Sequence, residues 1–238
     1  MRIVVLTGAG ISAESGVATF RDAGGLWEGH DIQDVATPEG FQRNPKLVQQ
    51  FYDERRRSLK EVHPNAAHRA LAELENHFGA DNVTIVTQNV DDLHERGGSD
   101  RVIHMHGQLH SAWCLACDTR HQWQEDLGNR PACPACEVQA LRPDIVWFGE
   151  IPYRMEEIER SLRSADVFAA IGTSGEVYPA AGFVAAATSY GARTVELNLD
   201  ASQAASNFDD VITGPATQVV PAWVSDLIAA SPSPAAES

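Results

Sequence analysis

Four cysteines in two closely spaced pairs are the residues of this chain whose spacing points most directly to chemistry. Cys114 and Cys117 form a CLAC pair, Cys133 and Cys136 form a CPAC pair, and residues 118–132 separate the two. Two Cys-x-x-Cys knuckles at such a separation are typical of a zinc ribbon, in which four thiolates close a tetrahedral site. Four thiolates leave no open position for water, so we expect one zinc ion with a structural role.

Disulfide bridges or a redox-active pair are the alternatives for these cysteines. The chain begins MRIVVLTGAG, with one basic residue and a short apolar run that leads directly into a glycine turn. A signal peptide would show a longer apolar region and a small-residue cleavage site, so we expect a first strand and a cytoplasmic location. Structural disulfides are disfavoured in that compartment. The neighbouring histidines are not needed as ligands, because four thiolates already saturate a zinc site.

A glycine-rich turn after the first apolar run has the pattern of a phosphate-binding loop. GAGISA, residues 8–13, satisfies G-x-G-x-x-G/A and directly follows the β-branched run RIVVLT, residues 2–7. Glycines allow a tight turn and a close approach to a pyrophosphate, and helix N-termini attract its charge. The pattern alone equally fits a plain strand-to-helix turn. A dehydrogenase would show a second strand and an acidic residue about 20 positions on, whereas Asp31 has no strand before it, which disfavours hydride transfer.

Polar side chains follow other predicted strands at the point where each strand ends. Gln88, Asn89 and Asp91 come after one apolar run, and His104 and His106 come within HMHG after another. The carboxyl ends of parallel strands are where such sheets bind ligands. Helix capping by Asn and Asp is the alternative for the first group. Further candidates at strand ends are Gly172, Thr173, Ser174, Asn198 and Asp200.

A basic cluster in VQQFYDERRRSL contrasts with the acidic character of the whole chain. Tyr52 and Arg55 are three residues apart on a predicted helix, so their side chains share a face. An Arg fork binds a carboxylate in bidentate fashion, and a phenol adds a second donor. A solvated basic face is the alternative. We adopt that second interpretation for Arg56 and Arg57.

An alternation of strands and helices is predicted to position these side chains. Strands are predicted within residues 2–7, 83–89, 101–107, 144–150, 166–175 and 193–200. Helices are predicted within residues 45–59, 65–78, 155–165 and 180–192, with a short helix opening in GAGISAESG. This alternation implies an α/β fold with a Rossmann-like, doubly wound, mostly parallel sheet.

Two segments do not fit the alternation and predict a second, smaller module. They are the loop-plus-helix insertion at residues 25–65 and the cysteine segment at residues 108–141. We expect this helical and zinc-ribbon module to rest on a discontinuous Rossmann-like domain of residues 1–24, 66–107 and 142–230. The Pro/Ser/Ala-rich tail, residues 231–238, is expected to be disordered.

Composition narrows the classes of function. The chain has 238 residues, of which 43% are hydrophobic, enough to bury a core. A net charge of −15 argues against a nucleic-acid binder, which would usually be basic. That charge is compatible with a basic partner such as a lysine-bearing protein. No apolar stretch approaches the roughly 20 residues of a membrane helix, so we expect no membrane association.

The joint occurrence of these motifs, in one order, resembles the sirtuin family of NAD-dependent protein deacylases. The resemblance covers nearly the whole chain and stops before the tail. It implies NAD as co-substrate, one structural zinc ion, acylated lysine side chains of proteins as substrates, and a monomer. The segments that carry it are GAGISAESGVATFR, TQNVDDLHERGG, HMHG, the two cysteine pairs, GTSGEVYPAAGF and ELNLD.

The resemblance implies a role for each matching residue. His106, directly before a glycine, matches the catalytic base, whereas His104 does not. Asn89 and Asp91 match contacts to the nicotinamide ribose and carboxamide, with Asn89 also in the catalytic set, and Gln88 matches a ribose contact. The other implied cofactor residues are Gly8, Ala9, Gly10, Ile11, Ser12, Thr19, Phe20, Arg21, Trp27, Gly172, Thr173, Ser174, Asn198, Leu199, Asp200 and Ala216.

Two further features concern the substrate and the loop. Tyr52 and Arg55 match the Tyr-x-x-Arg pair of class III sirtuins, which prefer acidic acyl groups, and Ala23 matches a small residue that makes room for a longer acyl chain. The resemblance therefore implies removal of succinyl or malonyl groups, and also of acetyl groups, with release of nicotinamide and O-acyl-ADP-ribose. One departure is Ala18, where the family usually has proline, which should leave the unliganded loop more flexible.

Three alternatives stay open from the sequence. The enzyme could be mainly a lysine deacetylase, or a mono-ADP-ribosyltransferase that uses the same cleavage of NAD. A zinc-ribbon binding module without catalysis is the non-enzyme alternative. It ranks last, because all the polar residues at the strand ends are present.

Overall fold

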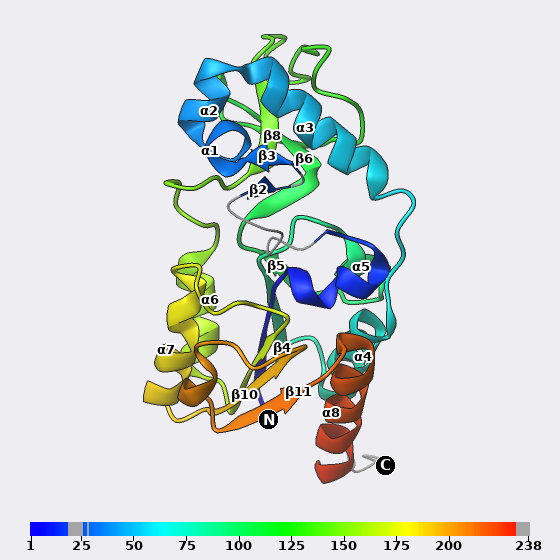
Figure 1. Ribbon diagram of the computed structural model, residues 1–238, viewed down its shortest axis with the longest axis vertical. Coiled ribbons are helices and arrows are strands. Elements are labelled where there is room, and N and C mark those ends of the chain that lie inside the picture. The colour runs from blue at the N-terminus through cyan, green and yellow to red at the C-terminus, as the bar shows by residue number, and fades with distance from the viewer. Residues whose placement is uncertain (19–25, 28, 232–238) are drawn as a thin grey trace.

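The computed structural model describes residues 1–18, 26–27 and 29–231, with only the backbone described at Leu26 and Trp27 (Figure 1). The predicted disordered tail lies outside the described residues apart from Ser231. A six-stranded parallel sheet forms one layer, in the order β11-β10-β9-β1-β4-β5. Its strands are β1 (Ile3–Thr7), β4 (Val83–Thr87), β5 (Val102–His104), β9 (Val167–Ile171), β10 (Arg193–Asn198) and β11 (Asp210–Thr213).

This strand order is that of the dinucleotide-binding doubly wound fold. Counted along the chain within this sheet, the strands run 3-2-1-4-5-6 from β5 to β11. β1 is the third strand from the β5 edge and pairs with both β4 and β9. The winding therefore reverses between β1 and β9, and ligands of such sheets bind in the crevice outside the carboxyl ends at that point. The predicted α/β fold class is confirmed.

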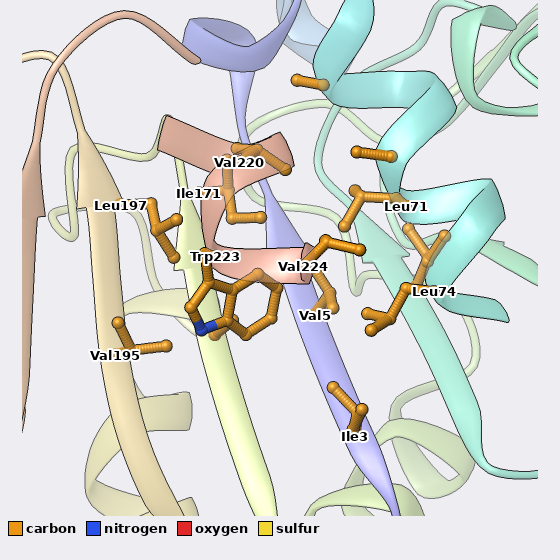
Figure 2. Packing of buried hydrophobic residues seen from close by; sticks show 14 of the residues in the cluster. Ile3, Val5, Leu71, Leu74, Ile171, Val195, Leu197, Val220, Trp223 and Val224 are labelled. Carbon is orange, nitrogen blue, oxygen red and sulfur yellow. The ribbon is translucent and has the colours of Figure 1, made fainter. Parts of the chain in front are cut away.

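Alternate residues of β1 build the core on the two faces of the sheet. Ile3 and Val5 face one apolar cluster, while Val4 and Leu6 face another, because successive side chains of a strand point to opposite faces. Figure 2 shows Leu71 packing with neighbours from a second helix over the first face. The helices on that face are α4 (Ala66–Phe78) and α8 (Ala216–Ala230), and those on the other are α6 (Met155–Arg163) and α7 (Phe183–Ser189).

The four longer helices that the sequence predicted all form, with shorter ends, whereas α8 was not predicted. Asn44 accepts a hydrogen bond from the Leu47 N–H and caps α3 (Pro45–Ser58), while Asn65 caps α4 in the same way. The apolar segment at 180–192 divides into a 3-10 turn and α7. Across the described residues no helix is long and apolar enough to cross a membrane.

A second, antiparallel sheet carries the cysteines. It consists of β6 (Gly107–Cys114), β7 (Arg120–Gln122) and β8 (Leu141–Ile145), in the order β7-β6-β8. We expected the strand predicted within 144–150 to belong to the parallel sheet, as part of the strand–helix alternation, and this prediction was wrong. The strand instead begins earlier, as β8, and pairs antiparallel with β6, because Leu141 and Ile145 pack into the apolar clusters of the small sheet. β8 thus crosses residue 142, where we placed a domain boundary; the division into domains stays a prediction.

Short helices and a hairpin cover this second sheet in the upper half of Figure 1. They are β2 (Leu26–Trp27), β3 (His30–Asp31), α1 (Ile32–Val35), α2 (Pro38–Arg43) and α3. An apolar cluster that includes Val48 and Phe51 of α3 and Leu109 of β6 joins these helices to the sheet. The helical insertion and the cysteine segment therefore pack together.

Arg56 is a correction to the sequence interpretation. We predicted a solvated side chain, yet Arg56 is 1% exposed. Its Nε donates to the Leu109 carbonyl at 2.7 Å, and its Nη1 forms an ion pair with Asp53 at 2.7 Å. A buried guanidinium is tolerated because these acceptors replace water. Arg57 is solvent-exposed as predicted and forms an ion pair with Asp126.

Candidate active site and zinc site

The turns after β1 and β9 lie against each other at the switch point of the sheet. The Gly10 N–H donates to the Gly172 carbonyl at 2.8 Å, and the Gly8 N–H donates to the Ile171 carbonyl at 3.0 Å. A Cβ at Gly10 would lie 2.7 Å from the Gly172 Cα, and Gly172 itself has φ of +61°. The glycines are thus required for two backbone turns to meet. The predicted short helix is instead two 3-10 turns, Ala9–Ile11 and Ala13–Ser15.

These interlocked turns suit a pyrophosphate. Among the described residues, the backbone N–H groups of Ala9, Thr173 and Ser174 have no hydrogen-bond acceptor. Phosphate oxygens would supply acceptors, and a nest of such donors is a common anion site. The residues present therefore fit the diphosphate of a dinucleotide.

A buried polar network lies directly beneath the glycine turn. Asn89 Nδ2 donates to the Gly8 carbonyl at 3.1 Å and to Ser12 Oγ at 3.2 Å, and Ser12 Oγ donates to Asp91 Oδ2 at 3.1 Å. Burial is the main cause that raises the pKa of Asp91, partly offset by its hydrogen bonds from Leu93 and Ser12. The predicted residues Ser12, Asn89 and Asp91 are thus brought together, although 77 positions separate Ser12 from Asn89.

His68 joins this network and was missed by the sequence analysis. Its Nε2 lies 3.4 Å from Ser12 Oγ, and its Nδ1 lies 3.3 Å from the backbone N–H of Asn65, so Nδ1 accepts. Burial lowers the pKa of His68 to about 4, which keeps the imidazole neutral. A buried histidine on an amphipathic helix gives no local signal that separates it from a core residue.

His106 has the geometry of a general base. It lies between β5 and β6, where Gly107, with φ of +82°, allows β6 to pass close to Asp144. His106 Nδ1 lies 3.1 Å from the Gln88 carbonyl, which can only accept, so Nδ1 carries the proton and Nε2 carries the lone pair. Burial lowers the pKa of His106, so the imidazole is unprotonated at neutral pH.

His104, the other imidazole of HMHG, is placed differently. Its Nε2 lies 2.6 Å from Glu95 Oε1, and its Nδ1 lies 3.3 Å from the Asn89 carbonyl. Both ring nitrogens therefore face acceptors within the protein. This arrangement supports assigning the base to His106 rather than to His104.

The end of β10 lies beside the β9 turn. Asn198 Nδ2 donates to the Thr173 carbonyl at 2.8 Å, and Gln88 Nε2 donates to Thr173 Oγ1 at 3.1 Å. Leu199, which follows β10, is 62% exposed. Asp200 comes next, and Ala216 begins α8. These predicted nucleotide residues thus cluster at or near the carboxyl edge of the sheet, and their roles stay predictions.

Several residues of the predicted cofactor and acyl sites lie outside the described part of the chain. Thr19, Phe20, Arg21 and Ala23 lie outside the described residues, as does the side chain of Trp27, whose backbone forms β2.

Tyr52 and Arg55 lie together on the inner face of α3, as the helical spacing predicted. Tyr52 is 0% exposed and its hydroxyl accepts a hydrogen bond from Trp147 Nε1 at 3.0 Å. Arg55 is 8% exposed, and its guanidinium carbon lies 3.2 Å from the centroid of the Phe51 ring. Burial raises the pKa of Tyr52, which keeps the phenol protonated and able to donate.

The four cysteines form a compact cluster at the end of the small sheet. Their sulfur atoms all lie within 4.8 Å of one another, and the Cys114–Cys136 and Cys117–Cys133 pairs are each 3.7 Å apart. A tetrahedral zinc ion with Zn–S bonds of about 2.3 Å would place sulfurs about 3.8 Å apart. The cluster therefore fits one structural zinc ion. His121 Nε2 lies 3.2 Å from Cys133 Sγ, outside the four-sulfur set.

Comparison with known proteins agrees with this geometry. Residues 8–179 match the Sir2 family. An "NAD-dependent protein deacylase" of Pasteurella multocida (strain Pm70) is 58% identical over 231 residues, covering 96% of this chain and 98% of the relative. A protein of the same name from Escherichia coli (strain K12) is 55% identical over 230 residues, covering 95% and 82%.

Solved structures give the same result. A crystal structure of a Sir2 homolog–NAD complex superposes with a TM-score of 0.87 at 36% identity, covering 96% of this chain and 90% of that one. An ADP-ribose complex of a mutant Sir2 homologue also reaches 0.87, at 35% identity, with 97% and 94% coverage. With a match across most of its length and relatives above 50% identity, this chain belongs to the Sir2 family.

Proposed function

We propose that this protein is an NAD-dependent protein-lysine deacylase that removes succinyl and malonyl groups, and also acetyl groups, from lysine side chains. The NAD-dependent deacylase activity is supported by the names of its relatives at 55–58% identity. The observation that carries the chemistry is His106, a buried neutral imidazole whose Nε2 lone pair is left available by the Gln88 carbonyl. The acyl preference rests on Tyr52 and Arg55.

His106 acts on a proton of the ribose. NAD would supply the anomeric carbon that the acyl oxygen of the modified lysine attacks, so that a C–O bond forms as the bond to nicotinamide breaks. His106 Nε2 then accepts a proton from a ribose hydroxyl, and the Gln88 carbonyl stabilises the ring through Nδ1. Asn89, held by Gly8 and Ser12, orients the same ribose. The deprotonated ribose oxygen attacks the acyl carbon, and one water molecule then releases the lysine nitrogen, so the products are nicotinamide, free lysine and O-acyl-ADP-ribose.

Arg55 and Tyr52 bind the far end of an acidic acyl group. A guanidinium and a phenol on one helix face offer two donors to a carboxylate, and their burial strengthens a charged hydrogen bond. A neutral acetyl group cannot use either donor.

Zinc takes no part in these steps, since four thiolates would leave it without an open position.

Replacing Arg55 by methionine is expected to change acyl selectivity. The variant should lose roughly 100-fold in kcat/KM for a succinyl-lysine peptide, because a charge-assisted interaction of about 3 kcal/mol is removed. For the matched acetyl-lysine peptide the loss should stay within about 5-fold. Arg57→Met, an exposed neighbour on the same helix, is the matched control and should change neither value. Equal losses for both peptides would show that Arg55 is structural.

Mass spectrometry of the products tests the activity itself. Purified protein, NAD and a panel of succinyl-, malonyl- and acetyl-lysine peptides should yield deacylated peptide and O-acyl-ADP-ribose. ADP-ribose attached to protein would instead indicate mono-ADP-ribosyl transfer. NAD left unconsumed with every peptide would contradict the proposal.

We further propose that the protein acts as a monomer in the cytoplasm. Size-exclusion chromatography of the purified protein tests whether it is a monomer.

A further inference from the structure

The hydroxyl of Tyr52 is engaged by an indole from a different part of the fold. Trp147 follows β8 after one intervening residue, is 2% exposed, and donates its Nε1–H to the Tyr52 oxygen at 3.0 Å. An indole N–H can only donate, so the phenol must be the acceptor in this bond. The proton of Tyr52 is therefore directed away from Trp147 and towards another acceptor.

The indole is held in place by an ion pair between buried Arg142 and half-buried Glu150. The Arg142 guanidinium carbon lies 3.4 Å from the centroid of a Trp147 ring, and Arg142 is 3% exposed. Arg142 Nη1 donates to Glu150 Oε1 at 2.7 Å, while Glu150 Oε2 accepts from the Trp147 backbone N–H at 2.8 Å. Phe41 contacts the indole as well, with ring centroids 5.2 Å apart. Both the ring and the backbone of Trp147 are thus fixed.

The surroundings of Tyr52 keep its phenol protonated and able to donate. Burial dominates and raises the pKa of Tyr52, while the Trp147 hydrogen bond and then the positive charges of Arg142 and Arg55 act in the opposite direction. Two cations therefore act on the phenol, with Glu150 opposing them. A carboxylate, which is an acceptor only, matches the donor direction of the phenol.

We propose that Trp147, held by Arg142 and Glu150, is a positioning residue for acidic acyl groups. By donating to the Tyr52 oxygen, it directs the phenol proton to the carboxylate of a succinyl or malonyl group. The inference rests on the proposed function, since it requires Tyr52 to bind the acyl end. An acetyl group offers no carboxylate, so Trp147 contributes little to its turnover.

Trp147→Phe tests this role because it removes the N–H and keeps an aromatic ring. The kcat/KM for a succinyl-lysine peptide is expected to fall about 5- to 10-fold, as loss of a buried hydrogen bond predicts. The loss should lie mainly in KM, because the carboxylate is bound equally in the ground and transition states. The acetyl-lysine peptide should change less than about 2-fold.

Two comparisons separate positioning from a general packing defect. Trp113→Phe is the matched control, because Trp113 also lies near Arg142, at 5.1 Å, but donates to Asp118 instead of Tyr52; its selectivity should equal that of the parent. In a Tyr52→Phe background, Trp147→Phe should cause no further loss of succinyl activity, since the indole acts through the phenol oxygen. Additive losses would overturn the inference.

A third variant guards against poor folding of Trp147→Phe. Benzothienylalanine at position 147 keeps the shape of tryptophan and replaces the N–H by sulfur, so it should reproduce the succinyl-specific loss without a cavity. If this variant keeps the parent selectivity while Arg55→Met loses it, the inference fails and the proposed function stands. If neither changes the ratio, the acyl preference itself is wrong.

Discussion

His106→Ala is expected to lower kcat/KM by about 1,000-fold with both succinyl- and acetyl-lysine peptides, because removal of a positioned general base costs about 10²–10⁴-fold. The loss does not depend on the acyl group, since His106 acts on the ribose. Steady-state measurement of O-acyl-ADP-ribose formation checks the value. Retention of more than a tenth of the activity would contradict the assignment.

His104→Asn is the matched control for that variant. His104 belongs to the same HMHG segment, yet its two nitrogens face Glu95 and the Asn89 carbonyl, so we expect a loss below about 10-fold.

The pH dependence of kcat/KM gives a second check on the role of His106. Because burial lowers the pKa of His106 from its ordinary value of 6.5, the base stays unprotonated at neutral pH. Activity should therefore decline only as the pH falls below about 6.5, and the variant His106→Ala should lack this acidic limb.

Removal of zinc is expected to unfold the cysteine-bearing sheet. Cys114 and Cys133 are 0% and 1% exposed, so without metal their sulfurs would remain buried in a sheet with a small apolar cluster. Structural zinc sites contribute on the order of 10 kcal/mol to folding. Cys133→Ser, or incubation with a strong chelator, should lower the Tm by at least about 10 °C and abolish activity. Differential scanning calorimetry measures the Tm, metal analysis verifies the loss of zinc, and the rate of O-acyl-ADP-ribose formation measures the activity.

Metal exchange distinguishes a structural from a catalytic ion. Four thiolates leave no position for water, so the cobalt-substituted protein should keep its Tm and its activity, with about one metal ion per chain. A turnover rate that follows the identity of the metal would contradict a structural role. Thr119→Ala, beside the cluster but outside the sulfur set, is the control and should retain one bound metal ion.

Much of the fold follows from short-range patterns. The buried strand after Arg2, the Asn44 and Asn65 caps and the two cysteine pairs depend on residues a few positions apart, so the sequence alone predicts them. The shared face of Tyr52 and Arg55 follows from helical spacing in the same way. The family resemblance added the role of His106, which no spacing indicates.

The sequence by itself determined the α/β class, the four-cysteine cluster and the shared helix face of Tyr52 and Arg55, because each is encoded by local periodicity or by a compact motif. Only the tertiary structure decided which segments meet. Arg56 is buried because Leu109 and Glu125, 53 and 69 positions away, supply acceptors. His68 reaches Ser12 across 56 positions, and Trp147 reaches Tyr52 across 95. Whether a polar side chain meets water or a buried partner depends on such long-range packing, which local patterns do not contain.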